Sequence, residues 1–149
     1  MRSLLESPRT AQILLSIGVL EFFGPILRDA GETHLLNPSW VGHARFHLMW
    51  FLVFMAGSGL ANLWLVWGVG DRRALWTAWG WQACNVLGFW GAAALERQYG
   101  GLIVDPEFHM TILGLNENVF VFVMLALLSG VTGLVLRGTP DAPAEVQHA

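Results

Sequence analysis

The chain has 149 residues, of which 54% are hydrophobic and only 13% are charged. Because charged residues make up roughly 25% of an ordinary soluble domain, this composition argues against a soluble globule. Eight arginines, no lysine and eleven acidic residues give a net charge of -3 without a basic stripe or tail, which argues against nucleic acid as a partner. The single cysteine, Cys84, excludes an intrachain disulfide and a cysteine cluster for zinc or iron–sulfur.

Four apolar stretches approach or exceed the roughly 20 residues that a bilayer core requires, at residues 10–27, 46–69, 74–95 and 119–136. Lipid cannot satisfy backbone polar groups, so each stretch is predicted to be helical. The short connection at 70–73 makes the second and third helices antiparallel neighbours. The sequence therefore predicts an all-α polytopic membrane protein, with a four-transmembrane-helix bundle over residues 1–137 and a disordered tail over residues 138–149. A cleaved signal peptide is the alternative for the first stretch, but no small-residue cleavage site follows Leu27.

The arginines predict the orientation of this bundle. The side that holds both termini carries Arg2, Arg9, Arg72, Arg73 and Arg137, and the other side carries Arg28, Arg45 and Arg97. Since positive charge concentrates in cytoplasmic segments, we expect both termini in the cytoplasm and the two longer loops outside an inner (plasma) membrane.

Two motifs predict where the second and fourth helices begin. Asn37-Pro38 and Asp105-Pro106 each place a capping residue before a proline, which is typical of a helix start. Helices over 37–69 and 105–136 would each be about 48 Å long. Residues 19–24 also resemble 86–91, and 37–40 resemble 105–108, at nearly the same offset. This echo predicts two tandem two-helix repeats, related by an axis along the membrane normal.

Most of the remaining polar residues belong to the side of the two longer loops. His43 and His47 are four residues apart and share a helical face, a spacing that suits a shared metal ion. The candidate metal ligands are His34, His43, His47 and His109, and under the repeat Glu117 falls near His47. Zinc, iron or manganese would suit this divalent site. The alternative is a hydrated rim whose histidines hydrogen-bond to loop backbone.

Glu21 is the other candidate, because its place in the first apolar stretch puts a carboxyl group inside the membrane. Its structural alternative is a carboxyl hydrogen-bonded to a neighbouring helix at Asn85 or Gln82. Pro25, one turn later, frees a backbone carbonyl near Glu21 and favours a kink.

The run Glu32-Thr33-His34, Asn37-Pro38, Trp40 and His43-Ala44-Arg45-Phe46-His47 resembles the signature of an uncharacterised family of small four-span membrane proteins. It covers about a tenth of the chain. The resemblance implies the four-span topology and the importance of these residues, and it implies no activity. In architecture alone the bundle is also similar to sterol-isomerase-like membrane proteins, without a matching motif.

Two classes of function fit these residues. The first is a metal-dependent or acid–base enzyme acting on a lipid-like or small apolar substrate, with Glu21 as a buried acid, Arg45 orienting a substrate oxygen and Glu117 as ligand or base. The second is a non-catalytic accessory subunit that binds a lipid, a quinone or haem. A channel or transporter is less favoured, because few polar groups line the cytoplasmic half. A homodimer is also expected, since a bundle rich in glycine and tryptophan has surface to spare for packing.

Overall fold

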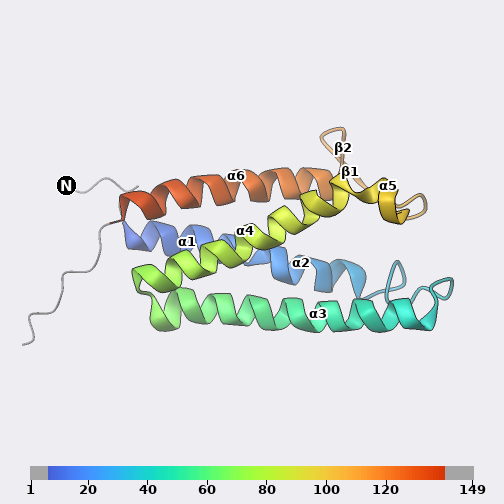
Figure 1. Ribbon diagram of the computed structural model, residues 1–149, viewed down its shortest axis with the longest axis horizontal. Helices are drawn as coiled ribbons and strands as arrows, with labels where there is room; N and C mark the ends of the chain where they lie inside the picture. Colours follow the sequence, from blue (N-terminus) through green and yellow to red (C-terminus); the bar gives the residue numbers. More distant parts are fainter. Residues whose placement is uncertain (1–6, 140–149) are drawn as a thin grey trace, which may run out of the picture.

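The computed structural model describes residues 7–139, which form a bundle of long helices (Figure 1). The first span consists of α1 (Pro8–Gly18) and α2 (Leu20–Asp29), which meet at Val19. It is followed by α3 (Gly42–Leu63), a π-helical segment η2 (Trp64–Val69), α4 (Arg72–Ala94) and the short α5 (Glu96–Tyr99). Strands β1 (Thr111–Ile112) and β2 (Leu115–Asn116) pair antiparallel, and α6 (Glu117–Gly138) follows directly.

Three helical stretches are long and apolar enough to cross a membrane: Pro8–Asp29, Gly42–Val69 and Glu117–Gly138. The mostly helical structure and these stretches confirm a helical membrane protein. Large apolar side chains also cover the outside of the bundle. On α3 alone, Phe46, Trp50, Val53, Phe54 and Leu60 are exposed. Such a continuous apolar surface is typical of contact with lipid. Helix α4 is as long as the others, but it carries Arg72, Arg73, Gln82 and Asn85 and does not reach the same apolar character.

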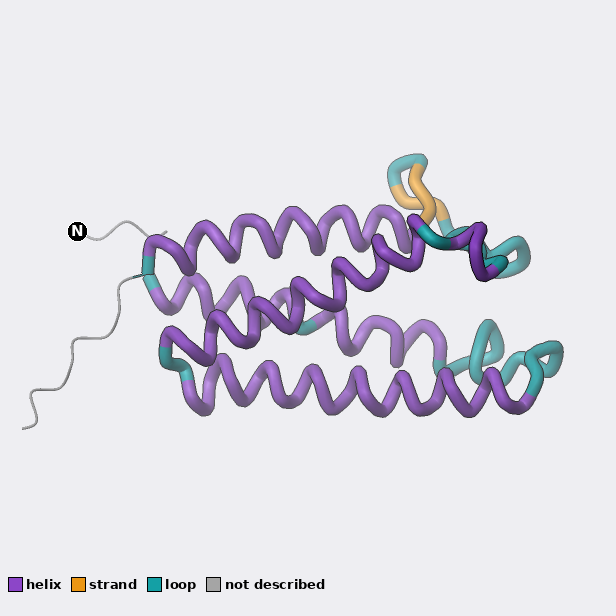
Figure 2. Tube along the Cα trace, viewed as in Figure 1, coloured by secondary structure: helices purple, strands orange, loops and turns teal. Residues whose placement is uncertain are grey.

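The connections between the helices gather at the two opposite ends of the bundle, as Figures 1 and 2 show. We call these the terminal end and the loop end. At the terminal end lie the start of α1, the end of α6 and the η2–α4 connection. At the loop end lie residues 30–41 and 95–116. Gly70 closes η2 in the left-handed conformation, with φ 68°, and its N–H donates to Leu65 O at 2.9 Å. The tight connection makes η2 and α4 antiparallel neighbours, as the sequence predicted.

The terminal end is the packed half of the bundle. Its core is formed by side chains of α1, η2, α4 and α6: Ala11, Leu15, Val66, Leu75, Ala78, Val135 and Leu136. The buried amide of Gln82 donates to Leu15 O at 2.9 Å and to Asn62 Oδ1 at 3.2 Å, and so joins α4 to α1 and α3. The Gln12 amide donates to Val66 O at 2.9 Å. These hydrogen bonds help to hold the helices together, because the hydrophobic effect does not drive helices to associate within lipid.

The loop end is open, because the helices separate there into two pairs. Helix α2 packs against α3, where the Phe23 ring lies on Gly59. Helix α4 packs against α6, where Phe89 stacks on Phe122 with ring centroids 3.8 Å apart. Figure 2 shows the α2/α3 pair diverging from the α4/α6 pair toward the loops.

Both predicted helix starts are wrong, since α3 begins at Gly42 and α6 at Glu117. The capping chemistry is present but closes turns instead of helices. Asn37 Oδ1 accepts from Ser39 N at 2.9 Å, and Asp105 Oδ1 accepts from Glu107 N at 2.7 Å and Phe108 N at 3.0 Å. These backbone N–H groups lower the pKa of the Asp105 carboxyl group. Asx turns and helix caps use the same residue types, so the sequence pattern alone could not distinguish a turn from a helix start. The predicted disordered tail lies outside the described residues beyond Thr139, and its first residue, Gly138, is helical.

Candidate functional site

A cavity of about 800 Å³ lies between the two helix pairs at the loop end, and we call it the interhelical cavity. Helices α2, α3, α4 and α6 all contribute to its wall. The apolar part of the wall includes Leu20, Phe51, Met55, Phe89, Val121, Phe122 and Leu125. Gly24 and Gly88 also line it, and a Cβ atom at either position would meet no atom within 4 Å among the described residues. The absence of side chains at these glycines therefore helps to keep the cavity open.

The polar groups in the depth of this cavity come from Glu21 on α2 and Asn85 on α4. Glu21 is only 4% exposed, and its carboxyl group faces the side chain of Asn85. Neither Glu21 Oε1 nor Asn85 Nδ2 has a hydrogen-bond partner within the described part of the chain. Of the two partners that the structural alternative offered for Glu21, the structure brings Asn85 to its carboxyl group, whereas the Gln82 amide bonds to Leu15 and Asn62 instead. Glu21 Oε1 and Asn85 Nδ2 thus face each other without a hydrogen bond of good geometry, and a polar group placed between them can bond to both.

At the mouth of the cavity, Arg28 bridges the two helix pairs. Its Nη2 atom donates to Glu117 Oε1 at 2.8 Å and to Phe108 O at 3.1 Å. The Glu117 side chain is 12% exposed and that of Arg28 is 34% exposed. Arg28 Nε is buried and has no hydrogen-bond partner among residues 7–139. The bridge therefore ties α2 to the start of α6 and leaves one donor of Arg28 free.

Removal of this bridge has a measurable expected effect. We expect Arg28→Gln and Glu117→Gln each to lower the free energy of unfolding in detergent by about 1 kcal/mol, since the pair is partly exposed. The double variant should lose less than the sum of the two single losses, because the same contact is removed twice. Chemical unfolding followed by circular dichroism measures these values. Fully additive losses would show that the two side chains do not stabilise each other.

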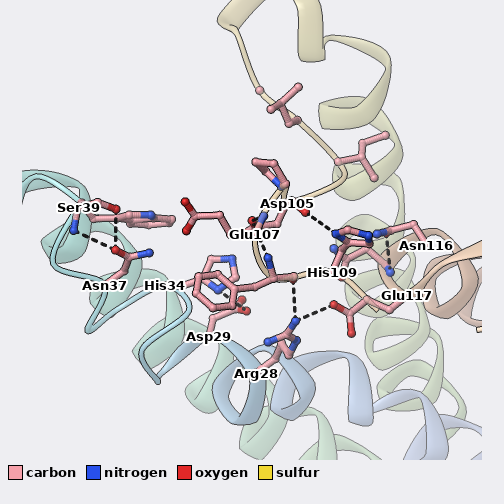
Figure 3. A pocket seen from close by; sticks show the side chains of 17 residues that line it. Arg28, Asp29, His34, Asn37, Ser39, Asp105, Glu107, His109, Asn116 and Glu117 are labelled. Atoms are coloured by element: carbon pink, nitrogen blue, oxygen red, sulfur yellow. Dashed lines mark hydrogen bonds and ion pairs between the residues drawn. The ribbon is translucent and has the colours of Figure 1, made fainter. Parts of the chain in front are cut away.

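Beyond the bridge lies a second, polar cavity of about 620 Å³, which we call the loop pocket (Figure 3). Arg28, Asp29 and Glu117 line both cavities, so the bridge stands between them. His34 Nδ1 lies 3.6 Å from Asp29 Oδ1 and 2.9 Å from Thr33 Oγ1, and the Trp40 ring stands edge-on to it. The other polar groups around the pocket are Asn37, Ser39, Asp105, Glu107, His109 and Asn116. Acidic groups outnumber basic groups in this pocket.

The predicted metal ligands do not assemble. His43 and His47 do share a face of α3, with their Nε2 atoms 3.0 Å apart, but both side chains are exposed. His109 Nδ1 instead contacts Asp105 O of its own loop at 3.0 Å, and Glu117 is paired with Arg28. Among residues 7–139, no group of three or more His, Cys, Asp or Glu side chains is placed to hold a metal ion. The described residues therefore do not support the predicted metal centre, and of these histidines His109 makes the contact with loop backbone that the alternative described.

Arg45, predicted to orient a substrate, lies on α3 and lines neither cavity. The arginine that does line the mouth of the interhelical cavity is Arg28. The sequence did not predict the pairing of Arg28 with Glu117, because the two residues are 89 positions apart and no local pattern links them. Of the predicted site residues, the structure thus places Glu21 and Glu117 on the wall of one cavity and His34 and His109 on the wall of the other.

Comparison of the chain with protein-family models, with curated proteins and with solved structures gives no match. The resemblance of the run from Glu32 to His47 to a four-span family therefore stays a prediction. Any function must be argued from the cavities themselves.

Proposed function

We propose that this membrane protein binds an amphipathic, lipid-like molecule in the interhelical cavity. The observation that carries the proposal is the combination of apolar walls with the unsatisfied polar atoms of Glu21 and Asn85 in the same cavity. Small-molecule sites are typically apolar concavities of roughly 300–1,000 Å³ with a few placed polar groups, and this cavity fits that description. Lipids and quinones are molecules of this class, in agreement with the binding hypothesis from the sequence.

The proposal includes a membrane arrangement in which α4 is a fourth span. Helix α4 has 23 residues, packs against α1 and α6 and starts directly after the η2 turn, so it must cross the same thickness of membrane as its neighbours. Both termini would then lie on the cytoplasmic side of the inner (plasma) membrane, as the arginines predict. Cysteines placed in the N-terminal segment and at Gly101 of a Cys84→Ala protein should react with an impermeant reagent from opposite sides. Labelling from the same side would exclude this topology. The tandem repeat and the homodimer stay predictions.

The binding proposal is tested by identifying what remains bound. The protein is purified in an uncharged detergent, washed extensively and extracted with organic solvent, and the extract is analysed by mass spectrometry. We expect one amphipathic species to be strongly enriched over its share of the bulk membrane lipids, which serve as the control. An extract that only mirrors the bulk composition would contradict the proposal.

A second candidate is acid–base chemistry on the bound molecule, favoured by the position of the Glu21 carboxyl group against the cavity. A carboxyl group inside the membrane is costly unless it has a function or a partner, which makes Glu21 the proton-transferring group of this candidate. The same extraction distinguishes the two. If the Glu21→Gln protein accumulates a species that differs in mass from that of the unmodified protein, the site converts its ligand. An identical species in both proteins supports binding alone.

A further inference from the structure

The two polar groups in the depth of the interhelical cavity differ in what they require from a ligand, and this difference defines a ligand class. The inference rests on the proposed function, since it concerns the occupant of the same cavity. Asn85 Nδ2 is a donor and Glu21 Oε1 is an acceptor, and although the two side chains face each other, neither atom has a hydrogen bond of good geometry within the described residues. The two side chains face each other from α2 and α4, so one polar group between them can serve both.

We propose that the cavity selects amphipathic molecules with a small, uncharged head group that both donates and accepts a hydrogen bond, such as the hydroxyl group of a long-chain alcohol, a phenol or a sterol. A hydroxyl oxygen accepts from Asn85 Nδ2 while its O–H donates to Glu21 Oε1, and this satisfies both buried atoms. A buried polar atom without a partner costs about 1–3 kcal/mol, so a head group that serves two such atoms is favoured over one that serves a single atom.

Charged head groups fit this position poorly. The carboxyl groups of the wall attract an ammonium group, but an ammonium group only donates, so it leaves Asn85 Nδ2 without an acceptor. An anionic head group meets three carboxyl groups on the cavity wall, those of Glu21, Asp29 and Glu117. The guanidinium group that lines the cavity, Arg28, is already paired with Glu117 at 2.8 Å. Anionic phospholipids and fatty acid carboxylates are therefore disfavoured by the charges that surround the site.

The apolar walls fit the remainder of such a molecule. The stacked rings of Phe89 and Phe122 and the ring of Phe51 contribute to the wall, with open space at Gly24 and Gly88. The chain or ring system of the ligand is thus buried against aromatic and aliphatic groups, and the head group supplies the selectivity.

Cys84 provides the readout, because it is the only cysteine of the chain, is exposed and lines this cavity. The rate of its labelling by a membrane-permeant maleimide is measured for the full chain in uncharged detergent. The probes are hexadecanol, hexadecanoate, hexadecylammonium and hexadecane, which share one chain and differ in the head group. We expect hexadecanol to protect Cys84 at a concentration about tenfold lower than any of the other three, as one or two hydrogen bonds would produce.

Variants connect this preference to the two residues. Glu21→Gln keeps a side-chain oxygen that accepts a hydrogen bond at this position and should retain most of the preference, whereas Glu21→Leu and Asn85→Leu should each reduce it to about threefold or less. Leu87→Ala, on the same helix and outside the cavity wall, is the matched control. Tryptophan fluorescence and circular dichroism confirm folding, and Asn85→Leu decides the test if Glu21→Leu fails to fold.

The outcomes separate the two proposals. Equal protection by all four probes would overturn the selectivity and leave lipid binding intact. A preference for hexadecanoate or hexadecylammonium would overturn the uncharged head group in favour of an ion pair. Protection by none of the probes would count against the proposed function itself.

Discussion

Replacement of Gly18 by leucine is expected to lower the free energy of unfolding by about 3 kcal/mol, the largest stability effect of a single substitution proposed here. The side-chain amide of Gln82 packs directly on Gly18, in the space that a Cβ atom would need. The larger residue displaces this amide and breaks its hydrogen bonds to Leu15 O and Asn62 Oδ1, which are both buried. The free energy of unfolding therefore decreases for two reasons, overpacking and the loss of buried hydrogen bonds, both at the packed terminal end of the bundle.

The matched control for this prediction is Gly80→Leu. Gly80 is a helical glycine of α4, and a Cβ atom there would meet no atom within 4 Å in the part of the chain that the structure describes. Since leucine has the higher helix propensity, this variant should be as stable as the unmodified protein or slightly more stable. Thermal unfolding in detergent, followed by circular dichroism, compares the two. Equal melting temperatures would show that the contact between Gln82 and Gly18 does not hold α4 on α1.

Replacement of Gly88 by leucine should remove the bound molecule and leave the fold intact. Gly88 lines the interhelical cavity, and a Cβ atom there meets no described atom within 4 Å, so a leucine side chain can extend from this position into the cavity. We expect the species found in the solvent extract to fall by about tenfold or more, since the side chain occupies the space of several ligand atoms and the lost contacts exceed 1.4 kcal/mol. The melting temperature should not fall, in contrast to the Gly18 variant.

Gly80→Leu is the control here as well, because Gly80 is on the same helix but not on the wall of this cavity. The extract of this control should contain the same amount of ligand as that of the unmodified protein. If Gly88→Leu retains the full amount, the molecule is bound somewhere else. If both variants lose it equally, the loss comes from a change in helix α4 and not from filling the cavity.

The membrane spans could be predicted from the sequence because an apolar stretch of sufficient length is a local property. Three of the four predicted stretches fall within helices of spanning character, and α4 occupies the fourth. The helix starts could not be predicted in the same way. Asn37 and Asp105 are residue types that often cap helices, but here each side chain caps a turn. Whether such a residue caps a helix or a turn depends on the conformation of the residues that follow it.

The candidate site was predicted in part for a similar reason. Glu21 stands out in the sequence because an acidic residue in an apolar stretch is rare, and the structure places it in the cavity. The metal hypothesis relied on the spacing of His43 and His47, which does make them neighbours. It could not reveal that this pair is exposed and that no third ligand joins it among residues 7–139, because that depends on contacts between distant segments. The bridge from Arg28 to Glu117 is such a contact.

The bound molecule is proposed to lie between the α2/α3 and α4/α6 pairs, and photolabelling can locate it. The protein is irradiated with hexadecanol that carries a diazirine on its chain, and the labelled residues are mapped by peptide mass spectrometry. We expect labels concentrated on residues 84–92 of α4 and 118–125 of α6, where these helices line the cavity. Labels concentrated instead on the outward apolar face of α3, at Val53, Phe54 and Leu60, would contradict this placement, since those side chains are exposed and lie outside the cavity.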